Sequence, residues 1–154
     1  MSFEIANMLI EYELSIAKLY NECAEKFTEL REFWKDLAKE EVGHSDTIKD
    51  VLAQVDGRSA VLNQRRFNAR PLENSLEYVN EITDRVKDNN IDLLGILSLA
   101  LDLEQSIIES KFYELFAGRS RDFNTWMKQV RDESRKHAVK IREMKEKVLN
   151  GEVI

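Results

Sequence analysis

Glu41 and His44 are the residues whose types and spacing first indicate chemistry. They lie three positions apart in an amphipathic stretch whose apolar residues recur at helical spacing, namely Trp34, Leu37, Ala38, Ile48, Val51, Leu52 and Val55. At 3.6 residues per turn, both fall on the apolar stripe and are expected to face the core. Burying a lone carboxylate is costly unless it is paired or coordinates a metal ion. Glu41 therefore needs either a counter-charge or a metal ion.

The other half of the chain carries the same residue types in the same order. Glu104 matches Glu13, each followed by a similar short segment, and Asp132-Glu133 matches Glu40-Glu41. A tryptophan lies seven residues before the second Glu of each half. Each half therefore offers one Glu on its first helix and a Glu and a His on its second. Such a repeat supplies the carboxylates and imidazoles that a bridged site for two metal ions requires in a helical bundle.

The two halves differ in the spacing of Glu and His. His44 follows Glu41 by three residues, whereas His137 follows Glu133 by four and Ser134 occupies the three-residue position. Residues four apart still share a helix face, so we expect Glu133 to reach the site. The alternative is that Ser134 replaces the ligand and leaves the second metal position weak or empty.

Each of these residues alone has an ordinary interpretation. Glu13 could be solvated beside the apolar stripe, and either His44 or His137 could be a core histidine that hydrogen-bonds a neighbour. His44 and His137 are, however, the only two histidines in the chain, and they occur at matched points of the repeat. This coincidence favours a metal site over separate structural roles.

The elements that must position these residues are helices. One proline and five glycines among 43% apolar and 34% charged residues are typical of a helical protein. The apolar periodicity predicts a helix pair at about 3–56, a crossover at 57–89 with a short helix from Pro71, and a second pair at about 90–150. Within the second pair we expect a helix at about 91–117, capped by Asn89 or Asn90 and the most buried of all. This layout predicts an all-α single domain over 1–154, an up-down-down-up four-helix bundle with ferritin-like connectivity.

Composition excludes several classes of function. A net charge of −6 argues against a nucleic-acid partner. No stretch is apolar and long enough for a signal peptide or a membrane span, so we expect no membrane association and a cytoplasmic location. The single cysteine, Cys23, cannot form an internal disulfide or a Cys-x-x-Cys metal site, and we expect it to be an inert buried thiol.

Over essentially its whole length, the sequence resembles the rubrerythrin-type branch of the ferritin-like family. The resemblance rests on Glu13 with Tyr20 seven residues later, Glu40-Glu41-Val42-Gly43-His44, Leu103-Glu104 with Phe112-Tyr113, and Asp132-Glu133 ahead of His137. It implies that Glu41 and Glu133 bridge two iron ions. It also implies that Glu13 and Glu104 are terminal ligands and that His44 and His137 bind one ion each. Tyr20 is implied to lie beside the site as a hydrogen-bonding partner of a ligand.

The chain departs from that family pattern at identifiable places. Ile107 occupies the position of a second carboxylate on the third helix, and the family's additional Glu on the fourth helix is missing. Rubrerythrins usually also carry a rubredoxin domain, and the 154 residues of this sequence contain no Cys-x-x-Cys pair for the iron site of such a domain. Electrons are therefore expected to come from a separate, rubredoxin-like donor protein.

Ligand chemistry and resemblance together predict the function. Carboxylate and imidazole ligands suit iron or manganese. We expect two iron ions in an oxidoreductase that reduces peroxide or O₂, or oxidises ferrous iron, in a homodimer. The alternative is a helical binding or sensor protein that keeps the fold with a partial or absent metal site. A third hypothesis, an iron-storage subunit, predicts assembly into a large shell.

Overall fold

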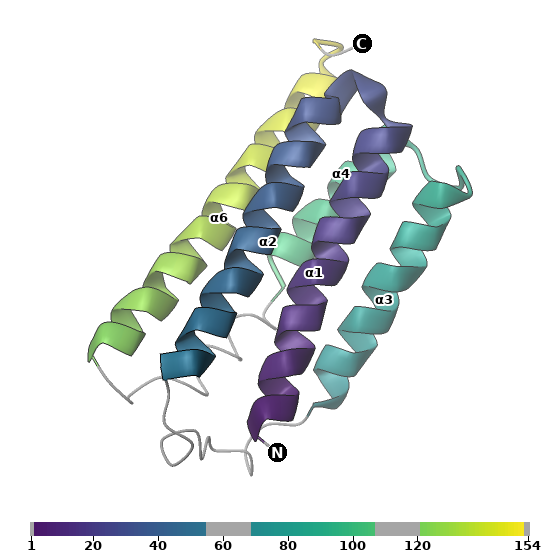
Figure 1. Ribbon diagram of the computed structural model, residues 1–154. Coiled ribbons are helices and arrows are strands. Elements are labelled where there is room, and N and C mark those ends of the chain that lie inside the picture. Colours follow the sequence, from purple (N-terminus) through teal and green to yellow (C-terminus); the bar gives the residue numbers. More distant parts are fainter. Residues whose placement is uncertain (1, 55–68, 107–120, 153–154) are drawn as a thin grey trace.

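The computed structural model describes residues 2–54, 69–106 and 121–152, and every regular element in these ranges is helical. The elements are α1 (Ser2–Lys26), the short 3-10 helix η1 (Thr28–Leu30), α2 (Arg31–Gln54), α3 (Arg70–Lys87), α4 (Leu93–Glu104) and α6 (Arg121–Leu149) (Figure 1). The prediction of an all-α protein is confirmed for these ranges. Ile107, most of the predicted crossover before Pro71 and the segment 107–117 lie outside the described residues. No helix of the described ranges combines the length and apolarity needed to cross a membrane.

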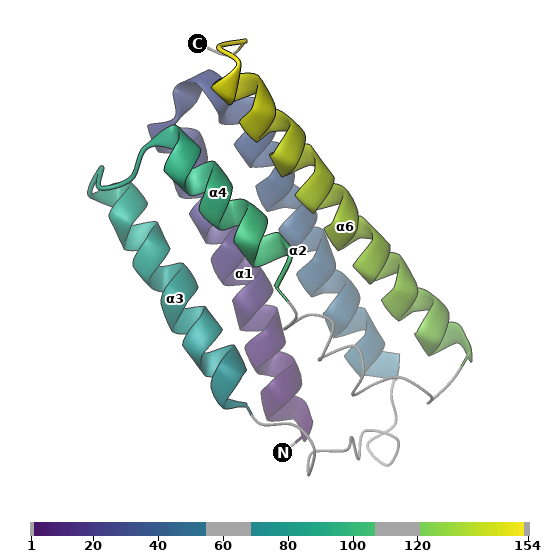
Figure 2. The same cartoon turned by 180° about the vertical axis from the view of Figure 1, so that it is seen from behind.

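Successive described helices run in opposite directions along one long axis. α1, α3 and α6 run away from the end at which the N terminus lies, and α2 and α4 run back toward it (Figures 1 and 2). α1 packs against α2 and α3, α4 packs against α6, and α2 also contacts α6. The contacts of α1 with α2 and of α4 with α6 fall within the two predicted helix pairs.

The described core is centred on α1. Its buried apolar side chains are Leu9, Ile10, Tyr12, Ile16, Ala17, Leu19, Tyr20, Cys23 and Ala24. They surround much of the helix because α2 and α3 cover it from different sides. The helix α3 contributes a stripe at helical spacing, made of Leu72, Val79, Ile82 and Val86.

Among the helices that the structure describes, the most apolar one, α4, is not the most buried. In α4 the side chains of Leu94, Leu99 and Leu101 are only half-buried, whereas α1 buries residues on several faces. The prediction that the helix at about 91–117 would be the most buried is therefore wrong for its described part. Position between two packed neighbours, and not hydropathy alone, decides burial here.

The turn between α3 and α4 differs from the predicted cap. Asp92 caps α4, since its side chain accepts a hydrogen bond from the Gly95 amide at 2.7 Å. Asn89 instead adopts a left-handed conformation with φ of 57° after the end of α3. The predicted capping role of Asn89 or Asn90 is therefore wrong, because the chain needs further residues to reverse direction after Asn89.

α4 also ends earlier than predicted. The amides of Gln105 and Ser106 bond to the carbonyls of Leu101 and Leu103, and the second of these bonds tightens the last turn. The helix therefore ends at Glu104 and does not continue without interruption toward residue 117. Glu104 consequently lies at the C-terminal end of α4, facing the core.

Candidate metal centre

The carboxylate of Glu41 lies between imidazoles from two helices. Its Oε1 is 3.0 Å from Nδ1 of His137 on α6, and its Oε2 is 3.4 Å from Nδ1 of His44 on α2. The exposed fractions are 0% for Glu41, 3% for His44 and 2% for His137. Ligand atoms of these three side chains lie within 4.8 Å of one another, so the group could hold a metal ion.

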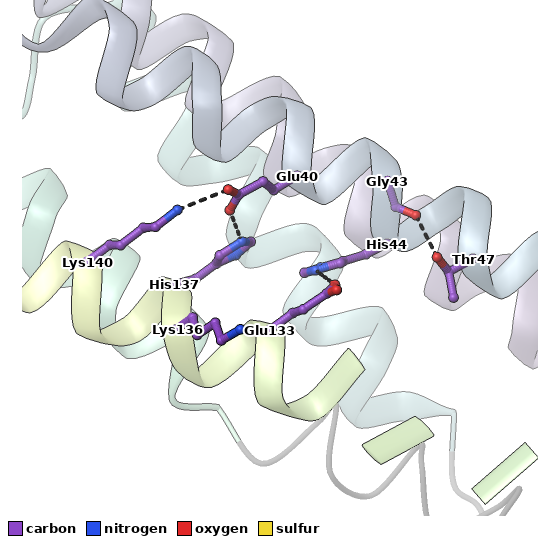
Figure 3. A pocket seen from close by; sticks show the side chains of 8 residues that line it. All are labelled: Glu40, Gly43, His44, Thr47, Glu133, Lys136, His137 and Lys140. Atoms are coloured by element: carbon purple, nitrogen blue, oxygen red, sulfur yellow. Dashed lines mark hydrogen bonds and ion pairs between the residues drawn. The ribbon is translucent and has the colours of Figure 1, made fainter. Parts of the chain in front are cut away.

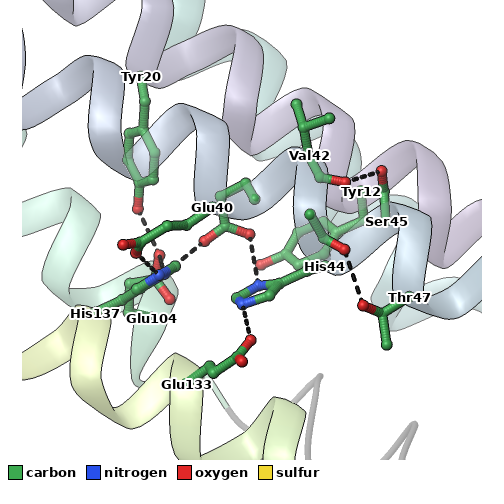
Figure 4. Close-up of polar contacts among 12 residues, drawn as sticks. Tyr12, Tyr20, Glu40, Val42, His44, Ser45, Thr47, Glu104, Glu133 and His137 are labelled. Atoms are coloured by element: carbon green, nitrogen blue, oxygen red, sulfur yellow. Dashed lines mark hydrogen bonds and ion pairs between the residues drawn. The ribbon is translucent and has the colours of Figure 1, made fainter.

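The two imidazole rings are stacked and point the same way. Their centroids are 5.0 Å apart and their planes differ by 21°. Both Nδ1 atoms face Glu41, and both Nε2 atoms face outward. Nε2 of His44 is 3.0 Å from Oε2 of Glu133, and Nε2 of His137 contacts Oε2 of Glu40 (Figures 3 and 4).

The outer carboxylates can determine which nitrogen binds a metal. An imidazole that donates its Nε2–H to an outer carboxylate presents the lone pair of Nδ1 inward. Glu40 in turn accepts a hydrogen bond from Nζ of Lys140 at 3.0 Å (Figure 3). The side chains of Glu40 and Glu133 are 39% and 43% exposed, so they form the solvent-facing rim of the buried group.

A second buried carboxylate approaches from α4. Oε1 of Glu104 is 3.6 Å from Nδ1 of His137 and accepts a hydrogen bond of 2.7 Å from the hydroxyl of Tyr20 on α1 (Figure 4). Tyr20 thus donates a hydrogen bond to the carboxylate that was predicted as a terminal ligand, and its role beside a metal ion stays a prediction. Four helices thus contribute to one cluster.

Glu13 is completely buried on α1, as predicted, with an exposed fraction of 0%. It lies seven residues before Tyr20, which is about two helical turns and places both on one face of α1. Its role as a terminal ligand stays a prediction.

The protonation of the metal-free cluster follows from these contacts. Burial alone lowers the pKa of His137, but its contacts with Glu104 and Glu41 outweigh burial and raise that pKa from 6.5 to about 11. Burial raises the pKa of Glu104, but hydrogen bonding and the charge of His137, with Glu41 and Tyr20, lower it below its ordinary value. A protonated His137 therefore supplies, in the absence of a metal, the positive charge that the buried carboxylates need.

The rim glutamate and Tyr20 respond to the same charges. Burial tends to raise the pKa of Glu40, but the hydrogen bond from Lys140 and the charge of His137 lower it overall. For Tyr20, burial and then the charges of Glu104 and Glu41 raise the pKa well above its ordinary value. The phenol is consequently held in its neutral form and can donate to Glu104.

Glu133 was predicted to bridge two ions together with Glu41, but its carboxylate does not lie beside that of Glu41. It contacts Nε2 of His44, whereas Glu41 contacts Nδ1, so the two carboxylates lie on opposite sides of that ring. Ser134, in contrast, is 6% exposed and therefore faces the interior. The structure thus brings Glu133 to the rim, and its role as a bridging ligand stays a prediction.

The sequence interpretation missed the role of Glu40. Its counterpart is Glu133, because each lies four residues before the histidine of its own helix and contacts the histidine of the other. Aligning the halves on the histidines, and not on the paired acids, would have revealed this. The same alignment matches Glu41 with Ser134.

A pocket of about 410 Å³ opens between α2 and α6 at the outer side of the cluster. Its lining includes both histidines, Glu40, Glu133, Lys136 and Lys140 (Figure 3). Both imidazoles are therefore part of the wall of this pocket. Comparisons with family models, characterised proteins and solved structures found no match to this chain.

Proposed function

We propose that this chain is a ferritin-like di-iron carboxylate protein of rubrerythrin type. In this proposal it is an oxidoreductase that reduces peroxide or O₂, or oxidises ferrous iron, with electrons from a separate donor protein. The observation that carries the proposal is the buried Glu41 carboxylate, which faces Nδ1 of two stacked imidazoles from different helices.

The stacking favours two metal ions over one. An imidazole binds a metal through a lone pair that lies in the plane of its ring. Because the rings of His44 and His137 are nearly parallel and present Nδ1 to the same carboxylate, their lone pairs run side by side and do not converge. Each ring is thus suited to its own ion, and Glu41, with one oxygen facing each Nδ1, is suited to bridging them.

The remaining ligands suit iron or manganese. Glu104 and Glu13 are buried carboxylates, hard donors that complement the imidazoles. Two ferrous ions bound here would supply the two electrons that reduce a peroxide to water. The protein would hold the ions, fix Glu104 through Tyr20 and His137 through Glu40, and admit the small oxidant through the pocket between α2 and α6.

The directions of the helices support the fold part of the proposal. α1 and α6 run in one direction, and α2 and α4 run in the opposite direction (Figure 2). α3, which lies between α2 and α4 in the sequence, runs in the same direction as α1. We propose that α1, α2, α4 and α6 form the up-down-down-up bundle and that α3 is the helix of the crossover. A homodimer is the proposed assembly.

Metal binding tests the proposal directly. Protein titrated with Fe(II) without oxygen should bind about two ions per chain, and Glu41→Gln should lose both because Glu41 bridges them. Glu143→Gln, which changes an exposed carboxylate of α6, is the matched control and should bind as the wild type does. The loaded protein should then oxidise about two ferrous ions per hydrogen peroxide, since each peroxide takes up two electrons and two protons.

Other stoichiometries point to other functions. Binding of fewer than about half an ion per chain would refute the metal site and favour the helical binding protein. Loss of only one ion in Glu41→Gln would refute the bridging role. A single tightly bound ion in the wild type would favour a sensor that uses a partial site, for which the rim position of Glu133 is the supporting observation.

A further inference from the structure

Ser134 interrupts an otherwise symmetric arrangement of side chains. On α2 the order is Glu40, Glu41, His44, and on α6 it is Glu133, Ser134, His137. The outer glutamates behave alike, because each contacts Nε2 of the other helix's histidine. The inner positions differ, because α2 has a bridging-type carboxylate where α6 has a hydroxyl.

The hydroxyl of Ser134 is unusual for a buried hydroxyl in a helix. Those of Ser15, Ser45 and Thr83 each donate to a backbone carbonyl three or four residues earlier, at 2.7–2.8 Å. Ser134 is equally buried, yet its Oγ has no hydrogen-bond partner among the described residues. A buried hydroxyl without a hydrogen-bond partner costs free energy unless another group forms a hydrogen bond with it.

We propose that the position beside Ser134 binds a small exogenous carboxylate, which completes the metal centre opposite Glu41. This inference rests on the proposed two-metal function. The carboxylate would bind the ions where a glutamate side chain is missing on α6, and the hydroxyl of Ser134 would donate a hydrogen bond to one of its oxygens. The ligand class is a short monocarboxylate of the size of formate or acetate.

The available space favours this ligand class. A serine side chain is shorter than a glutamate side chain by about the length of a one- or two-carbon acid. The neighbouring pocket of about 410 Å³ is large enough to admit such a molecule, and both histidines are part of its lining. Lys136 and Lys140 line that pocket together with Glu40 and Glu133, so the formal charges of these four side chains balance.

Cobalt(II) provides a test with a readout other than activity. The whole chain is loaded with Co(II), the bound cobalt is counted, and the visible absorption is recorded while sodium acetate is added at constant ionic strength, with sodium chloride as the control. We expect acetate, but not chloride, to change the spectrum in a saturable way. In Ser134→Ala the acetate affinity should fall about fivefold, because one hydrogen bond is lost.

Ser134→Glu provides the converse change. Its carboxylate should occupy the position, so cobalt affinity should rise at least about tenfold and the response to acetate should disappear. Circular dichroism verifies that both variants are folded.

The outcomes separate the two proposals. If no cobalt binds, the proposed function fails and the carboxylate site fails with it. If about two cobalt ions bind but acetate causes no saturable change, only the carboxylate site is overturned. The carboxylate site is likewise overturned if acetate binds equally well to wild type, Ser134→Ala and Ser134→Glu.

Discussion

Replacing Tyr20 by Phe isolates one hydrogen bond of the candidate centre. The Tyr20 hydroxyl donates to the buried carboxylate of Glu104 at 2.7 Å, and Tyr20 itself is 0% exposed. Hydrogen bonds to charged groups contribute about 1.5–3 kcal/mol, and phenylalanine fills nearly the same volume, so little cavity is created. We therefore expect the metal-free variant to lose about 2 kcal/mol of unfolding free energy at pH 7.

The pH dependence of this loss has a definite sign. The pKa of Glu104 is lowered in the folded protein, with Tyr20 among the causes. A carboxylate with a lowered pKa contributes stability above its unfolded value of 4.5, and this contribution disappears as the pH falls through the folded pKa. The difference between wild type and Tyr20→Phe should therefore be full at neutral pH and shrink in acid.

Urea unfolding followed by circular dichroism measures both effects, and Tyr78→Phe is the matched control. Tyr78 lies on α3 and is 43% exposed, so its replacement should change stability by less than about 0.5 kcal/mol. Metal affinity should also fall about tenfold in Tyr20→Phe, because Glu104 is less well oriented. Equal stability of Tyr20→Phe and Tyr78→Phe at pH 7 would refute the assigned role of the hydrogen bond.

Three further outcomes follow from the structure. Because the pKa of His137 is raised to about 11, metal binding at pH 8 should release about one proton from this residue. Titration calorimetry measures this release as an enthalpy that depends on the buffer, and no release would contradict the assignment of His137 as a ligand. Cys23 is fully buried and burial raises its pKa, so iodoacetamide should modify it only after unfolding; rapid labelling of the native protein would contradict this. Ile82→Ala on α3 should lower the free energy of unfolding in urea by about 2–5 kcal/mol, whereas replacing the exposed Leu149 by Ala should lower it little. Equal effects of the two substitutions would argue against packing of α3 on α1.

Local information was sufficient for the helices and for the inward direction of most candidate ligands. Apolar periodicity is a property of neighbouring residues along a helix, so it indicated where the described helices lie with few errors. It also indicated that Glu13, Glu41 and Glu104 face the interior, and all three are buried. The errors lie at helix ends, such as the cap at Asp92, where a few competing hydrogen bonds decide the outcome.

Whether Glu133 or Ser134 faces the centre could not be decided from the sequence. The two are adjacent and differ by about 100° around the helix axis, so either can be the inner residue, depending on how α6 is rotated against α2. Packing of α6 on α4 and α2 places Ser134 inside and Glu133 at the rim.

Residue types and spacing alone therefore established that two histidines and several glutamates belong to the interior of a helical protein. Only the tertiary structure determined which imidazole nitrogen faces which carboxylate, and that Glu40 contacts a histidine of another helix. The physical reason is that helical phase is a local property, whereas the rotation and register between α2 and α6 depend on packing among residues far apart in the chain.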